Sequence, residues 1–256
     1  ALLRGGRPAI DPAGARVGQY RTMVEAVAMR TTGLGGDSEV HFLSEGLEGG
    51  IELGPKRLLP VSLVAMDAPE VVHNALDAQL RSTTPGEFDG RFVRAVAGQT
   101  HEGIGPREVV LLERMGEAVH PLGDILRSRI ETGALKRLVE RGLVQVAGLT
   151  PSDASHALGR VDAWDADAAR KALRLFGRRR TGAGEMLDPD PDAMAQRVVD
   201  QLTQQTALAL LETAFAEEEP EFPGSPEVLA RHVLLQRGLK GHRGLLRIDA
   251  ALNLPV

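Results

Sequence analysis

The chain has 256 residues, 43% hydrophobic and 25% charged, which is typical of a globular protein with one large or two ordinary domains. Its net charge of −5 and aromatic content of 3% disfavour a dedicated nucleic-acid binder, which needs basic and base-stacking surfaces. The absence of cysteine excludes thiolate metal sites and suits a cytoplasmic protein, and no apolar run reaches the roughly 18 residues of a membrane span.

The first part of the chain, which we expect to extend over residues 1–105, alternates strand and helix patterns. Residues 3–10 are predicted to form a hairpin, and residues 22–30 a helix because apolar side chains recur on one side. Two strands at 40–43 and 50–53 are expected to pair as a second hairpin.

Residues 106–160 are predicted to form a winged-helix-like insertion. Three short helical patterns are followed by the strand-like run "LVQVAG", and three short helices before a strand is the order of a winged helix. Residues 161–256 are then expected to return to the first lobe through a buried helix over 192–216, capped by Asp192, and a strand at 245–250. This order of elements predicts an α/β fold with a helical insertion.

The third helix of the insertion offers an alternative function, a module for subunit docking or nucleic-acid binding. Lys136, Arg137 and Arg141 could contact phosphates. The acidic Glu131 and Glu140 on the same helix and the net acidity of the chain make nucleic acid the less favoured partner. A structural or subunit-docking role therefore fits the insertion better.

The stretch "GLGGDS" is the main candidate binding loop. The amides of Gly33, Gly35 and Gly36, with the Ser38 hydroxyl, could bind an oxygen of a phosphate or a carboxylate, because glycine permits positive φ and close backbone approach. Asp37 favours a magnesium-bound phosphate, a water or a donor-bearing substrate. The competing interpretation is an ordinary turn that ends the preceding helix and enters a strand, where no helix dipole attracts an anion.

Weaker candidates lie on a short helix that begins at "TPSD". Thr150 is its expected N-cap, and Asp153 and His156 could lie on one side of it. The spacing of the seven histidines predicts no metal site. The basic run 178–180 could meet a nucleotide phosphate, although a solvated loop is the favoured interpretation.

Four stretches together resemble the hydantoinase/oxoprolinase family, which includes N-methylhydantoinase and 5-oxoprolinase. They are "VGQYRTMVEAVAMRTTGLGGDSEV", "GIELGPKR", "GLTPSDASHALGRVDAWD" and "RIDAALNLPV", in the order that the family has. The resemblance implies part of an actin-like ATPase (ribonuclease H-like) lobe. It also implies ATP- and Mg²⁺-dependent opening of a cyclic amide, such as a hydantoin or 5-oxoproline, together with a hydantoinase B-type partner subunit or domain.

The resemblance carries the family's Gly-Gly-Gly-Ser pattern over to Gly35, Gly36 and Ser38, with Asp37 in place of the commoner glycine. The run "LLPVSLVAMDAP" departs from the small-residue, proline-rich stretch that the family has after the hairpin. The family's Asp-x-Gly-Gly-Thr phosphate loop and its Gly-x-Gly-Ala-Pro motif do not occur in the sequence. We therefore expect a central-to-C-terminal fragment of a longer hydrolase, incomplete for catalysis alone, in which no catalytic base is identified.

Overall fold

The computed structural model describes most of the chain between residues 31 and 218 and short pieces before it. The described residues are 3–4, 6–12, 14, 16–17, 20–22, 24–27, 31–43, 50–99 and 102–218. Two compact units divide the chain, residues 1–33 with 204–248, and residues 34–203 with 249–256. Helices and small sheets occur together, so the predicted α/β class is confirmed, whereas the actin-like lobe and the three-part domain division stay predictions.

The described strands of the smaller unit form antiparallel pairs of two residues each. The pairs are β1 (Leu3–Arg4) with β2 (Arg7–Pro8), β3 (Ile10–Asp11) with β6 (Ala26–Val27), and β4 (Arg16–Val17) with β5 (Tyr20–Arg21). The β1–β2 pair confirms the hairpin predicted at 3–10. The helix predicted at 22–30 is wrong for the described residues, because Val27 pairs with Ile10 in a strand. Valine is a β-branched residue that favours strands, and here the cross-strand pairing outweighs the helix-like spacing of the apolar residues.

The larger unit begins with a two-stranded antiparallel sheet that leads directly from the candidate loop. Its strands are β7 (Ser38–Leu43) and β8 (Gly50–Arg57), which confirm and extend the predicted second hairpin. Val40 and Leu53 are buried, so one face of this sheet packs on the core. The Val40 amide also donates to the Leu149 carbonyl at 3.1 Å, which fixes β7 beside the chain that follows the central sheet.

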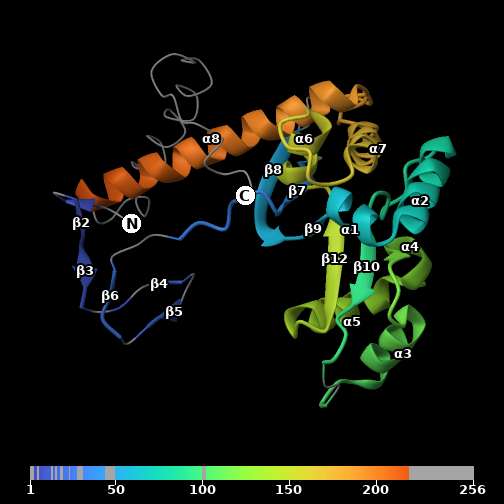
Figure 1. The fold of residues 1–256 in the computed structure, drawn as a ribbon, viewed down its shortest axis with the longest axis horizontal. Helices are drawn as coiled ribbons and strands as arrows, with labels where there is room; N and C mark the ends of the chain where they lie inside the picture. The colour runs from blue at the N-terminus through green and yellow to red at the C-terminus, as the bar shows by residue number, and fades with distance from the viewer. Residues whose placement is uncertain are drawn as a thin grey trace. The chain divides into compact units, whose positions relative to one another are not determined.

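A four-stranded sheet and five helices complete the larger unit's main core (Figure 1). The strand order is β11 (His120–Pro121), β10 (Phe92–Ala95), β12 (Val144–Gly148) and β9 (Leu59–Pro60), antiparallel except between β12 and β9. The helices are α1 (Val61–Asp67), α2 (Pro69–Arg81), α6 (Pro151–Ala157), α7 (Ala166–Gly177) and the first part of α8 (Pro191–Glu218).

A second hydrophobic core lies under three further helices in the predicted order. They are α3 (Pro106–Met115), α4 (Leu122–Ile125) and α5 (Arg129–Glu140), and β12 follows them. Leu111, Leu138 and Val144 are buried in this core together with Val93 of β10. The core thus includes a strand that precedes the predicted start of the insertion at residue 106.

α8 begins at Pro191, and its capping residue lies two positions before the predicted one. Asp190, not Asp192, accepts from the first amides, those of Asp192 and Ala193, each at 3.3 Å. Asp192 lies in the first turn and pairs with Arg170 at 2.6 Å. The helix is not buried all round as predicted, because Leu210 is 55% exposed. The strand predicted at 245–250 lies outside the described residues, and none of the described helices has the length and apolar character needed to cross a bilayer.

Candidate functional site

The candidate loop closes on itself through its own polar groups. The Gly35 amide donates to the Ser38 hydroxyl at 2.8 Å, and the Ser38 amide donates to the Gly35 carbonyl at 3.1 Å. Ser38 is 1% exposed, so its hydroxyl serves the turn and does not face solvent. The glycines at 33, 35 and 36 do not use positive φ, contrary to the reason given for them from the sequence. Gly33 is exposed and belongs to the smaller unit.

The loop is held against the start of α6, which lies 116 residues further along the chain. The Gly36 carbonyl accepts from the Ser152 amide at 2.9 Å and from the Ser152 hydroxyl at 2.8 Å. Ser152 is the second residue of α6, where an amide has no partner within the helix. The loop therefore supplies the acceptor that this helix end needs, and the main candidate and the weaker candidates are brought together.

Asp153 joins the starts of two helices. Its Oδ2 accepts from the amide and hydroxyl of Thr150, both at 2.9 Å, and from the Val61 amide at 3.3 Å. Its Oδ1 accepts from the amide and hydroxyl of Ser62 at 2.8 and 2.7 Å. Five donors fill a carboxylate that offers about four acceptor positions. Asp153 is fully buried, and this contact set assigns it to holding α6 against α1.

The environment of Asp153 acts on its pKa in two opposed ways. Burial raises the pKa of the Asp153 carboxyl, while the hydrogen bonds from Ser62 and Thr150 work in the other direction. The effect of burial is the larger, so the pKa is raised. The surrounding donors reduce the free-energy cost of burying the charged carboxylate.

His156 is also buried, at 2% exposure, on the same short helix. Its Nδ1 lies 2.8 Å from the Ser152 carbonyl, which can only accept, so Nδ1 carries the hydrogen. The ring stacks on Trp164 with centroids 4.7 Å apart and planes at 10°. Nε2 is buried and has no hydrogen-bond partner in the described part of the chain. The geometry thus gives His156 a packing role, with one unused acceptor.

Asp37 and Arg57 form the solvent-facing part of the loop region. Arg57 Nε donates to Asp37 Oδ2 at 2.5 Å, and the two side chains are 76% and 34% exposed. The Asp37 carbonyl accepts from the Leu58 amide at 2.9 Å, which ties the loop to the end of β8. Sequence reasoning missed Arg57, although "GPKR" places two adjacent cations at the end of a strand.

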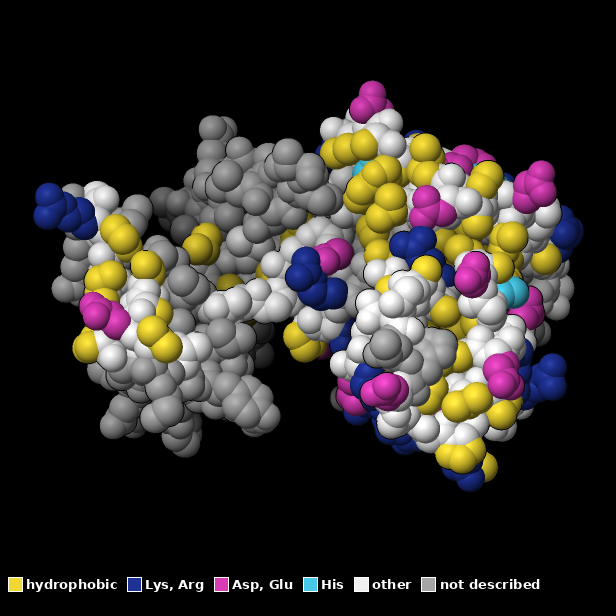
Figure 2. Space-filling view, turned by 60° about the horizontal axis from the view of Figure 1, so that its bottom comes forward, with side chains coloured by type: hydrophobic (Ala, Val, Ile, Leu, Met, Phe, Trp, Pro, Cys, Tyr) yellow, Lys and Arg dark blue, Asp and Glu magenta, His cyan; other side chains and the backbone are white. Residues whose placement is uncertain are grey.

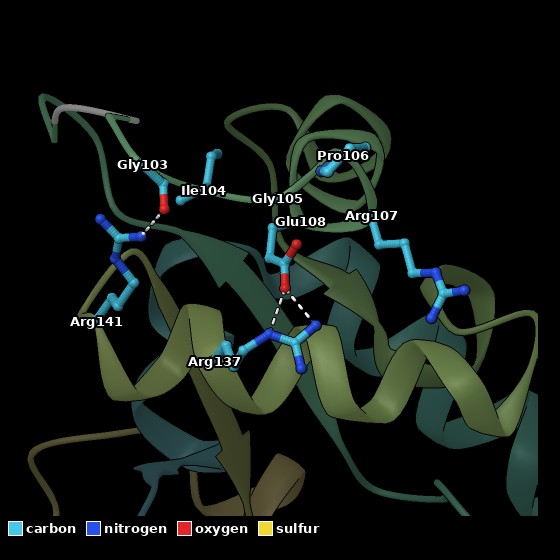
Figure 3. A pocket seen from close by; sticks show the side chains of 8 residues that line it. All are labelled: Gly103, Ile104, Gly105, Pro106, Arg107, Glu108, Arg137 and Arg141. Atoms are coloured by element: carbon cyan, nitrogen blue, oxygen red, sulfur yellow. Dashed lines mark hydrogen bonds and ion pairs between the residues drawn. The ribbon is translucent and has the colours of Figure 1, made fainter.

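A separate pocket of about 460 Å³ lies at the start of α3 (Figure 3). Its charged lining residues are Arg107 and Glu108 on α3, Arg137 on α5 and Arg141 just after α5. Glu108 is buried and pairs with Arg137, and its own amide and Arg137 lower the pKa of this carboxyl. Arg141 donates to the carbonyls of Gly103 and Glu102, each at 2.6 Å.

The three basic residues that the sequence offered for phosphate contacts, Lys136, Arg137 and Arg141, therefore already have partners. Arg137 and Arg141 are engaged as described above, and Lys136 lies 3.7 Å from Glu140, four residues along the helix. A phosphate backbone would have to compete with these contacts. This arrangement adds to the net acidity as a reason to disfavour nucleic acid as a partner.

Comparison with protein-family models, with the curated proteins and with the solved structures finds no match. The family resemblance of the sequence consequently stays a prediction. Among the described residues, no group of three or more His, Asp or Glu side chains is placed to hold a metal ion.

Proposed function

We propose that the chain forms one wall of the cleft of an ATP- and Mg²⁺-dependent hydrolase that opens a cyclic amide of the hydantoin or 5-oxoproline type. The supporting observation is a convergence in space. Three of the stretches that carry the resemblance meet at the loop: Asp37 contacts Arg57 of "GIELGPKR", and Gly36 contacts Ser152 of "GLTPSDASHALG". Binding and catalytic residues lie disproportionately on loops that a packed scaffold positions.

The residues at this convergence fit a phosphate through their side chains more than through their amides. The Gly35 amide is already used by Ser38, but Arg57 uses only Nε in its described contacts. A guanidinium has five N–H donors, so Arg57 retains four for phosphate or carboxylate oxygens. Asp37 orients this guanidinium and offers oxygen toward a magnesium-bound water. Bound nucleotide would supply the phosphoryl group that activates the amide.

The proposal includes an incomplete site and a partner. The two glycine motifs that the family uses are absent from the sequence, so further phosphate contacts would come from a longer protein. A hydantoinase B-type subunit or domain and a cytoplasmic location belong to the same proposal, because they rest on the same resemblance.

Calorimetric titration with Mg²⁺ and ATP tests this proposal, on this chain and on the longer protein that the resemblance predicts. We expect binding by the longer protein, weakened about tenfold or more by Arg57→Gln, since a charge-assisted contact to phosphate contributes roughly 1.5–3 kcal/mol. ADP release that depends on a hydantoin or on 5-oxoproline identifies the reaction. If neither protein binds ATP, the proposal is wrong.

A second candidate function is subunit docking through α3 and α5. These helices expose Val109, Val110 and Ile130, at 38%, 49% and 66%. In Figure 2, hydrophobic side chains lie scattered among charged ones on the face that is shown. A Val110→Asp variant that keeps its far-ultraviolet spectrum but loses a partner in co-purification would support docking; unchanged assembly would exclude this face.

A further inference from the structure

Three consecutive arginines follow α7, and the fold places them in different surroundings. Arg178 donates to the carbonyls of Gln79 and Leu80 at 3.3 and 3.1 Å, where α2 ends. Arg180 donates to the Gly184 carbonyl at 2.5 Å in an exposed loop. Both guanidinium groups therefore have backbone acceptors, and their charges lie near carbonyl dipoles.

Arg179 differs, because its guanidinium has no hydrogen-bond acceptor among the described residues. Its guanidinium carbon lies over the Phe176 ring, 4.9 Å from the centroid. Burial, and next the charge of Arg91, lower the pKa of Arg179. The side chain is half-buried and its nitrogens are not among the buried unpaired atoms, so its unused N–H donors can be reached by an acceptor from solvent.

Neighbouring carboxylates do not provide that acceptor. Glu39 is 4% exposed and is bound by Arg91, with His41 Nε2 at 3.4 Å. Asp89 accepts from the Gly86 amide at 2.8 Å. Neither carboxylate forms an ion pair with Arg179, although both lie close enough to act on its charge.

Arg179 and Arg91 line one small cavity. Its other lining residues are the apolar Val40, Leu149, Ala172 and Phe176, together with Asp89 and Gly90. The cavity volume of about 10 Å³ admits one water-sized group. Arg91 and Arg179 are both half-buried, with 24% of the Arg91 side chain exposed, so both guanidinium groups lie near the surface.

We propose that Arg179 and Arg91 form a subsite that takes one oxygen of a small oxyanion, a carboxylate or a phosphate. An oxygen at this position accepts from the unused donors of Arg179 and replaces its missing acceptor, and the second guanidinium adds attraction. A water can also accept from these donors, but it brings no negative charge to offset the repulsion between Arg91 and Arg179. The subsite stands independently of the loop at 35–38 and of the proposed function.

Thermal unfolding tests the subsite with sodium acetate, sodium phosphate and sodium chloride, each titrated alone. The wild-type chain is compared with Arg179→Gln and with Arg180→Gln, a matched control whose side chain contacts only an exposed loop carbonyl. We expect acetate or phosphate to raise the melting temperature of the wild type and the control in a saturable way. The rise should be about 3–6 °C at ten times Kd, and Arg179→Gln should lack it.

The response to each anion decides the outcome. A response to acetate alone identifies a carboxylate subsite, and a response to phosphate alone a phosphate subsite. Identical responses of the wild type and Arg179→Gln to all three salts would overturn the proposal and leave the cavity to water. A saturable response to chloride alone would also overturn it.

A second measurement needs no variant. In an NMR titration of the wild-type chain, the Nε–H resonance of Arg179 should shift with the effective oxyanion and saturate at the same Kd. A resonance that stays in place while the melting temperature rises would overturn the assignment to Arg179.

Discussion

Replacement of Asp153 removes the acceptor on which two helix starts depend, so we expect Asp153→Ala to be strongly destabilising. The buried amides of Val61, Ser62 and Thr150 lose their partner. Each buried donor left unpaired costs about 1–3 kcal/mol, and relief of the buried charge offsets part of the sum. We expect the free energy of unfolding to fall by about 3–5 kcal/mol.

Asp153→Asn should cost less, about 2 kcal/mol, because its single carbonyl oxygen can serve only one side of the site. If that oxygen keeps the donors of Thr150, the side-chain NH₂ faces the Ser62 amide, and the reverse orientation sacrifices Thr150. Urea unfolding followed by fluorescence of Trp164, the single tryptophan, reports on this part of the fold. Asp162→Ala, at an exposed position, is the control. A loss below about 1 kcal/mol for Asp153→Ala would refute this account of the carboxylate.

The pH dependence of the same variants checks the sign of the electrostatic argument. The pKa of Asp153 is raised in the folded chain relative to the unfolded one. Its protonation therefore stabilises the fold fully below the unfolded pKa, and that contribution is lost as pH rises through the folded pKa. The free energy of unfolding of the wild type relative to Asp153→Asn should therefore fall as pH rises through the folded pKa of Asp153. A difference that does not change with pH would contradict the raised pKa.

Three further variants test other contacts. Gly177→Ala should lower the free energy of unfolding by about 1–3 kcal/mol, because a Cβ would lie 1.8 Å from the Asp188 carbonyl oxygen. Gly35→Ala is the control: its Cβ would meet Asp37 Oδ1 at 3.6 Å, an ordinary contact, so its stability in urea unfolding should stay within about 0.5 kcal/mol of wild type. Hydrogen bonds from Arg114 and from the Arg127 amide lower the pKa of Glu131. Wild type should therefore be more stable than Glu131→Gln at neutral pH, and this advantage should disappear as pH falls through the folded pKa of Glu131. An advantage that persists in acid would contradict this. His156→Phe keeps the stacking on Trp164 and removes the unpaired Nε2, whereas His156→Ala leaves a cavity that should lower the free energy of unfolding by about 2–4 kcal/mol. The Phe variant should therefore lose less stability than the Ala variant. Equal losses would show that stacking contributes little.

Local signals in the sequence predicted the elements whose causes are local. The start of α6 follows from Thr150 and from Asp153 in the first turn, which form a capping box in the structure. The hairpin of β7 and β8 follows from two short strand-like runs that are close together in the sequence. The helix predicted at 22–30 failed because Val27 pairs with Ile10, and a partner 17 positions away leaves no mark in the local pattern.

The candidate site was predictable in its parts but not in its connections. The loop at 35–38 and the helix of Asp153 were both named from the sequence, yet nothing local indicates that Gly36 meets Ser152 or that Ser62 meets Asp153. The same applies to Arg57, whose side chain meets Asp37 from 20 positions further along the chain. Hydrogen bonds between residues 20 to 116 positions apart depend on the tertiary fold, which spacing rules do not contain.

The strand pair β10–β12 has a consequence for how the chain folds. Ala95 pairs with Val144, and the Val96 amide donates to the Leu143 carbonyl at 2.9 Å, so the sheet holds the two ends of the segment 96–143 together, and β11 within the segment also pairs with β10. Once that pair has formed, the ends of this segment are held together. The helices of the segment then pack around their own core through contacts within the segment. Hydrogen exchange should therefore show α3, α4 and α5 opening as one unit, at a lower free energy than the main core, while β10 and β12 stay protected with the sheet.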